Sequence, residues 1–531
     1  MLINSLEFLG FIFAILLIYI AVPKKAKWTV LLIASYIYYF SNSTYLILCI
    51  LFTTISIYFV ALKMGKIDEI TKIKIKEIEE REKKKELKNK AKKKKKKILT
   101  IGILINLAVL AVLKYSGFIG ENINSLLKIL HINASMPIQE FILPLGISYY
   151  TLQAISYMVD VYRGTVKADK NLGRVALFLS FFPQLVQGPI GRYDRLANNL
   201  YEPHKITYKN LTYGAQLMLW GYFKKMVIAD RVSMYVNEVF ANYSEYSGII
   251  IILAILGYTL QLYAEFSGGI DIVRGVAEIF GVYLDKNFER PFFAKSVDEF
   301  WRRWNITLGT WLKDYVFYPV SLSKWSTKLT ESSKKVFKET YFSKIVPISF
   351  SLLCVWLCNG IWHGAGSKYV IYGLYYYLIM MLGKIFEPVS NKIIKVFKIN
   401  TEVFSYKLWQ ILRTDMFVCF GMLIFRAQNI YEAFLIFKSI FKIHGLELVF
   451  NGTGFLLGGM TVGDWLILAI SSIILLCTSI YKEAGNNIRQ NLSKQNLLYR
   501  WIILYGVLFA IVIFGIYGKG YNVQSFIYGQ F

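Results

Sequence analysis

Apolar stretches separated by short polar segments recur along the whole chain. Many of them approach the roughly 20 residues that an α-helix needs to cross a bilayer. Two further stretches, at 141–159 and 175–186, are interrupted by proline, glycine and polar residues. The pattern predicts an all-α, polytopic integral membrane protein with about eleven to thirteen membrane helices, in a single domain over residues 1–531. The uninterrupted stretches are residues 6–22, 28–40, 45–62, 98–113, 211–229, 248–263, 345–357, 369–382, 416–425, 465–480 and 501–517.

Two segments are neither simple spans nor simple loops. One is 144–150, where Pro144 and Gly146 place helix breakers inside apolar sequence, and the other is 265–315, which mixes tryptophan with arginine, lysine and aspartate. Broken helices at membrane depth are tolerated only where protein or a water-filled cavity lines them. We therefore expect broken or re-entrant helices around a polar centre. The sequence shows no inverted repeat of the kind that marks many transporters.

Composition agrees with a membrane protein, with 55% hydrophobic and 16% aromatic residues and a mean hydropathy of +0.44. The net charge of +27 invites a nucleic-acid interpretation, but its distribution argues against one. Residues 63–97 hold 17 Lys/Arg against 7 Asp/Glu and end in six consecutive lysines before an apolar stretch. That pattern is typical of a cytoplasmic loop that can also attract anionic lipid headgroups, whereas nucleic-acid binding usually needs a fold or interleaved aromatics. We expect an amphipathic, solvated helix on the cytoplasmic surface and no nucleic-acid partner.

The same charges predict the orientation of the chain in the cell membrane. Lys24, Lys25 and Lys27 place the first short loop in the cytoplasm, the uncharged loop 41–44 faces outside, and 63–97 is inside again. This alternation implies an outside N-terminus. Pro23 and the lysines that follow the first apolar stretch do not resemble a cleavage site, so we expect no cleavable signal peptide.

Trp362-His363-Gly364-Ala365 lies at the end of the apolar stretch that begins near Ile345. An ionisable side chain at membrane depth is by default a hypothesis for a functional site. The alternative is a structural histidine, hydrogen-bonded to a backbone carbonyl at a helix end. The other three histidines lie in polar or loop-like sequence and are His131, His204 and His444.

The five cysteines all lie in apolar segments, and their odd number argues against a disulfide framework. Cys354, Cys358 and His363 have a spacing loosely suggestive of metal ligation, but a structural zinc site needs a fourth ligand and none is obvious nearby. We expect no metal site and interpret the cysteines as small hydrophobic residues. None of them carries the signature of a covalent nucleophile.

Phe300-Trp301-Arg302-Arg303-Trp304-Asn305-Ile306-Thr307-Leu308 resembles the central motif of the membrane-bound O-acyltransferase (MBOAT) superfamily. The resemblance covers nearly the whole chain and is closest to the bacterial group of the alginate O-acetyltransferase membrane subunit and the teichoic-acid D-alanyl transfer protein. Any one motif is weak, but the ordered set is specific. The other motifs lie at 4–8, 144–150, 160–164, 182–190, 265–271, 287–288, 311–315, 359–364, 425–427 and 526–528. The resemblance implies a ring of helices around a central tunnel.

The resemblance implies that His363 is the essential histidine and Asn305 the second polar position of the active site. Close relatives usually carry histidine after Arg-Arg-Trp, so Asn305 departs from their pattern, although other branches of the superfamily have asparagine there. Acyl transfer to a hydroxyl needs a base and a donor for the developing oxyanion. A neutral imidazole, with a pKa of about 6.5, suits the first role. The Asn305 amide suits the second role, or orients the acceptor.

Further candidates concern the acyl donor. Guanidinium groups at Arg302 and Arg303 suit the phosphates of coenzyme A or a phosphopantetheine arm, but they also suit interfacial anchoring beside Trp301 and Trp304. We expect Glu265, Asp271 and Asp314 to pair with these arginines and to hold the broken helix. Pro144, Gln153 and Gln187 are candidates for a pore lining. The donor- or substrate-binding candidates are Arg302, Arg303, Trp304, Asp314, Glu265 and Gln187.

The resemblance favours an enzyme that moves an acyl group, acetyl in the first instance, from a cytoplasmic thioester across the membrane for O-acetylation of a cell-surface or exported polysaccharide. The donor, acetyl-coenzyme A or an acyl carrier protein, is a substrate, and no bound cofactor is expected. A separate extracytoplasmic partner protein then completes delivery to the polymer. The alternatives are D-alanyl transfer to teichoic acid and a non-catalytic transporter or flippase. We expect an extended loop between Lys313 and Tyr341. It is longer than the resemblance implies for the teichoic-acid branch, and it therefore favours acetylation over D-alanylation.

Overall fold

The computed structural model describes residues 1–531 except 43, 139–140, 186, 443–445 and 518–531. The described residues form helices and no β-strand, which confirms the all-α prediction. Eight of the described helices are long and apolar enough to cross a membrane, which confirms a polytopic protein. The other predicted spans form shorter helices, so the larger number stays a prediction. The motif at 526–528 and His444 lie outside the described residues.

The chain divides into two compact units, and the single domain stays a prediction. The first unit comprises Met1–Ala215 and Val273–Asp285. Within it α5 packs against α3 and α4, and α6 packs against α2 and α3. Its helices are α1 (Leu6–Ala21), η1 (Lys24–Ala26), α2 (Lys27–Asn42), α3 (Ile47–Glu77), α4 (Arg81–Ile129), α5 (Ile147–Arg163), α6 (Leu172–Ser180), α7 (Phe182–Leu185) and α8 (Tyr193–Tyr201), with the first part of α9 (Tyr208–Tyr222) and the end of α11 (Ile249–Ile279).

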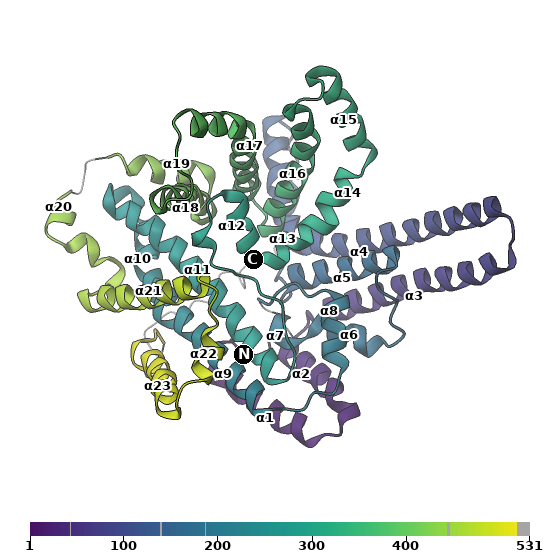
Figure 1. The fold of residues 1–531 in the computed structure, drawn as a ribbon, viewed down its shortest axis with the longest axis horizontal. Coiled ribbons are helices and arrows are strands. Elements are labelled where there is room, and N and C mark those ends of the chain that lie inside the picture. Colours follow the sequence, from purple (N-terminus) through teal and green to yellow (C-terminus); the bar gives the residue numbers. More distant parts are fainter. Residues whose placement is uncertain (43, 139–140, 186, 443–445, 518–531) are drawn as a thin grey trace. The chain divides into compact units, whose positions relative to one another are not determined.

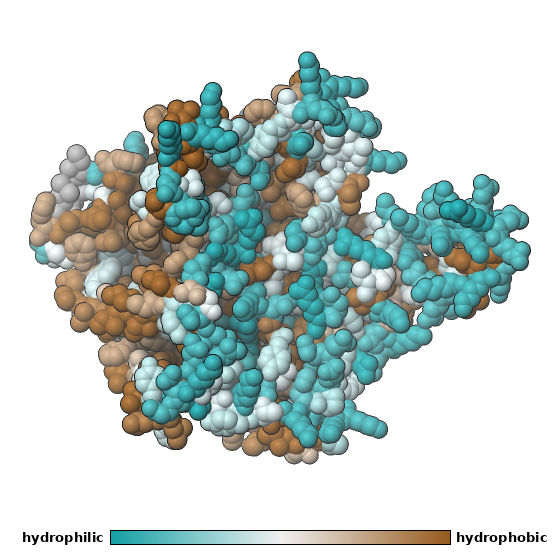
Figure 2. Space-filling view, viewed as in Figure 1, coloured by the Kyte–Doolittle hydropathy of each residue, from teal (hydrophilic) through white to brown (hydrophobic). Residues whose placement is uncertain are grey.

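The lysine-rich segment is a hairpin, which corrects the prediction of a single amphipathic helix. Residues 63–77 continue α3, and residues 81–97 begin α4, so that both helices extend from apolar spans into polar sequence (Figure 1). Half-buried positions recur every three or four residues on both helices, as in Ile67, Thr71 and Ile75, because each helix covers one face of the other. Most of the surface at the turn end of the hairpin is hydrophilic (Figure 2).

The second unit comprises Gln216–Ile272 and Lys286–Gln530. Within it α16 packs against α15 and α17, and α17 packs against α18. After the rest of α9 and the first part of α11, its helices are η2 (Phe223–Ala229), α10 (Asp230–Ala241), η3 (Tyr243–Glu245), η4 (Pro291–Phe293), α12 (Val297–Arg303), α13 (Ile306–Leu312), η5 (Lys313–Phe317), α14 (Tyr318–Ser321), α15 (Lys324–Phe337), α16 (Tyr341–His363), α17 (Ser367–Val396), α18 (Phe404–Arg426), α19 (Ile430–Ser439), α20 (Leu446–Phe450), η6 (Thr453–Phe455), η7 (Leu457–Gly459), α21 (Val462–Glu483), α22 (Ile488–Ser493) and α23 (Leu497–Phe514).

Two π-helical segments, η2 and η5, interrupt α-helices of the second unit. A π-helical turn loosens the regular ladder of backbone hydrogen bonds and is often found near functional sites. At η2 the carbonyl of Met226 accepts a hydrogen bond from the backbone N–H of Ile516 at 3.0 Å. Directly after η2, the buried guanidinium of Arg231 donates to the Asp464 carboxylate and to the carbonyl of Phe514. These bonds join the start of the unit to its last helices.

The segment between Lys313 and Tyr341 is helical. It contains η5, α14 and α15, and α15 packs against α14 and α16. The prediction of an extended loop between Lys313 and Tyr341 is therefore wrong, because most of the segment is helical. Its exposed polar positions carry lysine and serine, residues that suit a solvated helix as well as a loop.

Candidate active site

His363 is the last residue of α16, and its side chain is buried, with 5% of its surface exposed. The helix ends there because Gly364 adopts an extended backbone, with φ −179° and ψ 168°. The imidazole packs edge-on against the Tyr372 ring of α17 and the Phe425 ring of α18, with centroid distances of 5.6 and 5.2 Å. Three helices of the second unit therefore hold the histidine inside an aromatic cluster.

Glycines allow α16 and α17 to approach closely enough to hold this histidine. A Cβ atom at Gly360 would lie 2.3 Å from the carbonyl oxygen of Tyr369, and one at Gly373 would lie 2.3 Å from that of Trp356. A Cβ atom at Gly364 would lie 2.2 Å from the ring of Tyr369. These distances are too short for any side chain. The sequence therefore needs glycine at all three positions for this packing.

Asn305 connects α12 to α13 and is also buried, with 4% of its surface exposed. Its backbone lies in the left-handed region, with φ 46° and ψ 53°. The turn is held by Asn287, whose backbone carbonyl accepts from the Ile306 N–H at 3.0 Å. The Asn287 Oδ1 atom accepts from the backbone N–H and the hydroxyl of Thr307 at 2.9 and 2.7 Å. Asn305 therefore has a fixed place in the interior.

Aromatic contacts bring the helix before Asn305 to the helices around His363. The Trp301 ring of α12 lies 5.1 Å from Trp356 and 4.7 Å from Tyr376, centroid to centroid. It also lies 6.4 Å from the ring of Tyr372, which contacts His363. In addition, α13 packs against α16. His363 and Asn305 thus lie on neighbouring elements of one cluster.

Several buried polar atoms of this cluster have no hydrogen-bond partner among the described residues: Oδ1 of Asn305, Oδ1 of Asn359, Nε1 of Trp301 and Nδ2 of Asn287. Most buried polar atoms in proteins are hydrogen-bonded, and each exception needs an explanation. A bound polar substrate is one such explanation. Asn359 precedes His363 by four residues on α16, so both face the same side of the helix.

Sequence reasoning missed Asn359 as a candidate site residue, because it treated this asparagine only as part of a motif. The available signal was its spacing from His363. An amide four residues before a buried histidine, on an apolar helix, shares its face.

The two arginines of the central motif have different surroundings. Arg303 lies 2.7 Å from Glu299 and 3.0 Å from Glu483, so it ties α12 to the end of α21. Burial alone lowers the pKa of Arg303, but hydrogen bonds and charges from Glu483 and Glu299 outweigh it and hold that pKa above its usual value. Arg302 is exposed and pairs with no carboxylate among the described residues. Arg302 is therefore the better candidate for binding a phosphate.

The predicted pairing of acidic residues with these arginines is wrong for Glu265 and Asp271. Glu265 Oε1 lies 3.1 Å from the buried ammonium of Lys225, which also lies 2.7 Å from Asp230. Asp271 Oδ2 lies 2.7 Å from the ammonium of Lys224. Both lysines come from η2. Glu265 therefore forms part of an ionic cluster with η2, and its role toward a donor stays a prediction.

The remaining three candidates lie on different elements of the chain. Trp304 caps α12 and packs against Phe288 and Phe300, with ring centroids 5.0 and 5.5 Å away. Asp314 is half-buried in η5. Gln187 belongs to the first unit, where its side chain is fully buried and both polar atoms lack a hydrogen-bond partner among the described residues. The structure thus groups His363, Asn305 and Trp304 in one unit, whereas Gln187 belongs to the other.

Comparisons with known proteins agree with the motifs. A sequence profile of the membrane-bound O-acyltransferase family matches residues 166–331. A probable alginate O-acetylase of Pseudomonas syringae pv. tomato is 30% identical over 66% of this chain and 61% of its own length. A peptidoglycan O-acetyltransferase of Helicobacter pylori is 29% identical over 66% of both chains. A teichoic acid D-alanyltransferase of Bacillus subtilis is 30% identical over 54% of this chain and 70% of its own length.

The match thus spans about three fifths of the alginate O-acetylase and more than two thirds of the D-alanyltransferase. The profile covers the segment that contains Asn305, and the helix that carries His363 follows it along the chain. Together with the apolar helices and the ordered motifs, these matches establish that the chain belongs to the membrane-bound O-acyltransferase family.

Proposed function

We propose that the protein is an O-acyltransferase that moves an acyl group, acetyl in the first instance, from a cytoplasmic thioester across the membrane for O-acetylation of a cell-surface or exported polysaccharide. Membership of the family supports acyl transfer, and the names of the alginate and peptidoglycan relatives support a polysaccharide acceptor. The observation that carries the proposal is the buried His363 at the end of α16, beside elements that hold Asn305 and unpartnered polar atoms.

In the proposed reaction, His363 acts as a general base. Its imidazole takes the proton of an acceptor hydroxyl, and the oxygen attacks the thioester carbonyl carbon. The C–S bond then breaks, and the thiolate leaves with the proton that the imidazolium returns. The Asn305 amide N–H stabilises the oxyanion of the tetrahedral intermediate or orients the acceptor. Burial of both side chains excludes water, which would otherwise hydrolyse the thioester.

The proposal has two versions, which differ in the acyl donor and in the final acceptor. In the first version, acetyl-coenzyme A is the donor and a separate extracytoplasmic partner protein passes the acetyl group to the polymer. In the second version, a carrier protein supplies D-alanine for teichoic acid. The second is supported by the match to the D-alanyltransferase of Bacillus subtilis, of which the matched part covers the larger share. Arg302 suits the phosphate of either donor.

The test uses membranes that contain the wild-type protein or the variants His363→Ala and His131→Asn. Each receives radiolabelled acetyl-coenzyme A with a crude cell-envelope acceptor, and label in polymer and free coenzyme A are measured. We expect transfer by the wild type and by His131→Asn, which changes an exposed histidine, and loss of transfer in His363→Ala. Asparagine is the control substitution because His131 has a φ of 55°.

Full transfer by His363→Ala, at equal protein level, would remove the proposed base. If no form consumes the donor, the same membranes are given a D-alanyl-loaded carrier protein. Consumption of that donor supports D-alanyl transfer, whereas no consumption of either donor favours transport without chemistry.

A further inference from the structure

The lysines that end the polar part of α4 are not equivalent. Lys95 is buried, and its ammonium lies 2.7 Å from Asp68 of α3 and 3.1 Å from the carbonyl of Tyr162 of α5. It therefore holds the hairpin against α5. The other members of the run are exposed and form no ion pair with any described residue: Lys92, Lys93, Lys94, Lys96 and Lys97. Their charges are available to a ligand.

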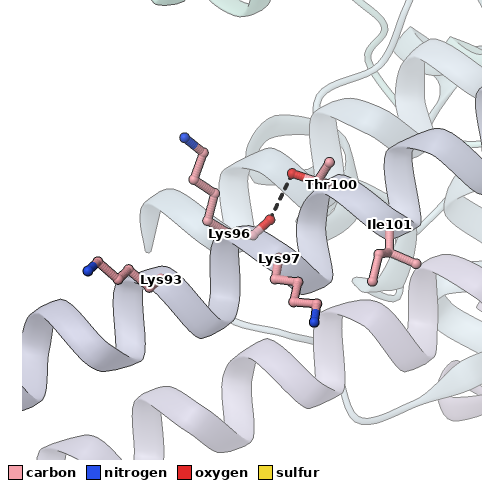
Figure 3. A pocket seen from close by; sticks show the side chains of 5 residues that line it. All are labelled: Lys93, Lys96, Lys97, Thr100 and Ile101. Carbon is pink, nitrogen blue, oxygen red and sulfur yellow. Dashed lines mark hydrogen bonds between the residues drawn. The ribbon is translucent and has the colours of Figure 1, made fainter.

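Three of these lysines lie around a shallow hollow on α4, with Thr100 and Ile101 at its other end (Figure 3). The side chains of Lys93, Lys96 and Lys97 point in different directions, so they form an open patch and not a closed cage (Figure 3). The Thr100 hydroxyl donates to the carbonyl of Lys96 at 2.9 Å. The lysine ammonium groups therefore carry the positive charge that a ligand meets here.

The same helix continues directly into an exposed apolar surface. Ile101, Leu104 and Ile105 keep 47%, 60% and 41% of their surface exposed. Lys93, Lys97, Ile101 and Leu104 follow one another at spacings of three or four residues, so they lie along one face of α4. That helix is also a candidate membrane span. The face thus has a cationic end and an apolar end.

We propose that this face of α4 binds an anionic phospholipid, with the headgroup phosphate at Lys93, Lys96 and Lys97 and an acyl chain along Ile101, Leu104 and Ile105. Basic residues beside a membrane span attract anionic headgroups, and each lysine near the surface adds to the binding. An acidic protein would pair only with the charges of the lysines. An anionic lipid pairs with those charges and also covers the apolar residues that follow them on α4. The lipid therefore accounts for both halves of the surface.

The test measures lipid retained by the purified full-length protein after incubation with equal amounts of phosphatidylglycerol and phosphatidylcholine. We compare the wild type with K93Q/K96Q/K97Q and with K83Q/K84Q/K85Q, which removes three charges near the hairpin turn. We expect the wild type and the turn variant to prefer phosphatidylglycerol on the order of 10- to 100-fold. The first variant should lose most of that preference, and K93R/K96R/K97R should keep it.

Equal retention of both lipids by the wild type would overturn the proposal and leave an acidic protein as the better ligand. An equal loss in both glutamine variants would also overturn it, because the effect would then follow from net charge. If K93Q/K96Q/K97Q does not insert, the wild type alone decides the question. The preference of the wild type for phosphatidylglycerol must fall with rising salt. Soluble glycerol phosphate must not displace the bound lipid, since displacement would indicate a site for free phosphate.

Discussion

Asn305 has a left-handed backbone conformation inside the protein, with φ 46°. Glycine, asparagine, aspartate and histidine tolerate this conformation better than other residues. Histidine, which the resemblance implies for close relatives at this position, and asparagine both suit this backbone conformation although they differ in chemistry. An alanine here adds roughly 1–2 kcal/mol of backbone strain. A lower activity of an alanine variant would therefore not distinguish loss of the amide group from backbone strain.

Asn305→Gly removes the amide group without backbone strain. We expect its transfer rate to fall by about 100-fold or more if the amide stabilises the oxyanion, because such donors contribute about this factor. Its thermal stability should stay close to that of the wild type. Asn305→His should retain measurable transfer. Rates are measured with labelled donor and stability by thermal unfolding in detergent, and a wild-type rate for Asn305→Gly would contradict the proposed role.

Asn359 offers a second test of the candidate site. Its Oδ1 atom has no hydrogen-bond partner among the described residues, so Asn359→Leu removes little protein–protein bonding. We expect a fall in transfer rate of about tenfold or more, as for loss of a substrate-positioning contact, with little change in melting temperature. A large loss of stability at an unchanged rate per folded molecule would instead indicate a structural asparagine.

The sequence predicted His363 because an ionisable residue at the end of an apolar stretch is uncommon, and Asn305 because of a motif. It did not predict which cations meet Glu265 and Asp271. Their partners, Lys224 and Lys225, lie in residues 211–229, which were interpreted as an apolar span. The arginines were expected as partners because they belong to the central motif, but contacts in a helical protein depend on packing between elements.

The packing of the antiparallel helices α16 and α17 depends on small residues. Gly373 and Gly383 both belong to α17, but a Cβ atom at Gly373 would lie 2.3 Å from the Trp356 carbonyl, whereas one at Gly383 would meet nothing within 4 Å. The two glycines therefore form a matched pair.

We expect Gly373→Ala to lower the free energy of unfolding by about 1–3 kcal/mol, through overpacking between the helices. Because α17 also carries Tyr372, which contacts His363, the transfer rate should fall as well. Gly383→Ala should be neutral or stabilising by up to about 1 kcal/mol, since alanine favours a helix. Thermal unfolding followed by tryptophan fluorescence measures the stability of both variants, and labelled donor measures their transfer rates. Equal effects of the two substitutions on stability would refute the packing argument.

Element positions followed from hydropathy to a large extent. The long apolar stretches became helices such as α11 and α16, because an apolar helix is the simplest way to satisfy backbone groups in lipid. The π-helical segments η2 and η5 were not predicted, because hydropathy does not distinguish a π-helical turn from the α-helix around it. The hairpin of α3 and α4 was missed because its lysine content obscured the half-buried seam between the helices.

The clearest marker of how the chain is oriented in the membrane is α4. Its 49 residues extend about 73 Å at about 1.5 Å per residue, against an apolar bilayer core of about 30 Å. The helix must therefore project beyond the membrane on at least one side. The lysine-rich end carries the charge that is typical of the cytoplasmic side.

Cysteine labelling tests this orientation in a background in which the five native cysteines are replaced by serine. Lys85→Cys, at the exposed hairpin, should react with a membrane-impermeant maleimide only after the cells are opened. Glu121→Cys, exposed on the other part of α4, should react in intact cells. The reverse pattern would show that the orientation predicted from the lysines is wrong.

The hydrogen bonds of Arg231 can form only late in the synthesis of the chain. Its partners Asp464 and Phe514 lie 233 and 283 residues further along the chain. At about 5–20 residues per second, translation needs on the order of ten seconds or more to reach the first of them. A nascent chain stalled after residue 450 should therefore be more protease-sensitive in its earlier part than the full-length chain. Until α21 and α23 emerge, the growing protein carries a cation destined for its interior, and water, lipid phosphate or the insertion machinery has to solvate that cation.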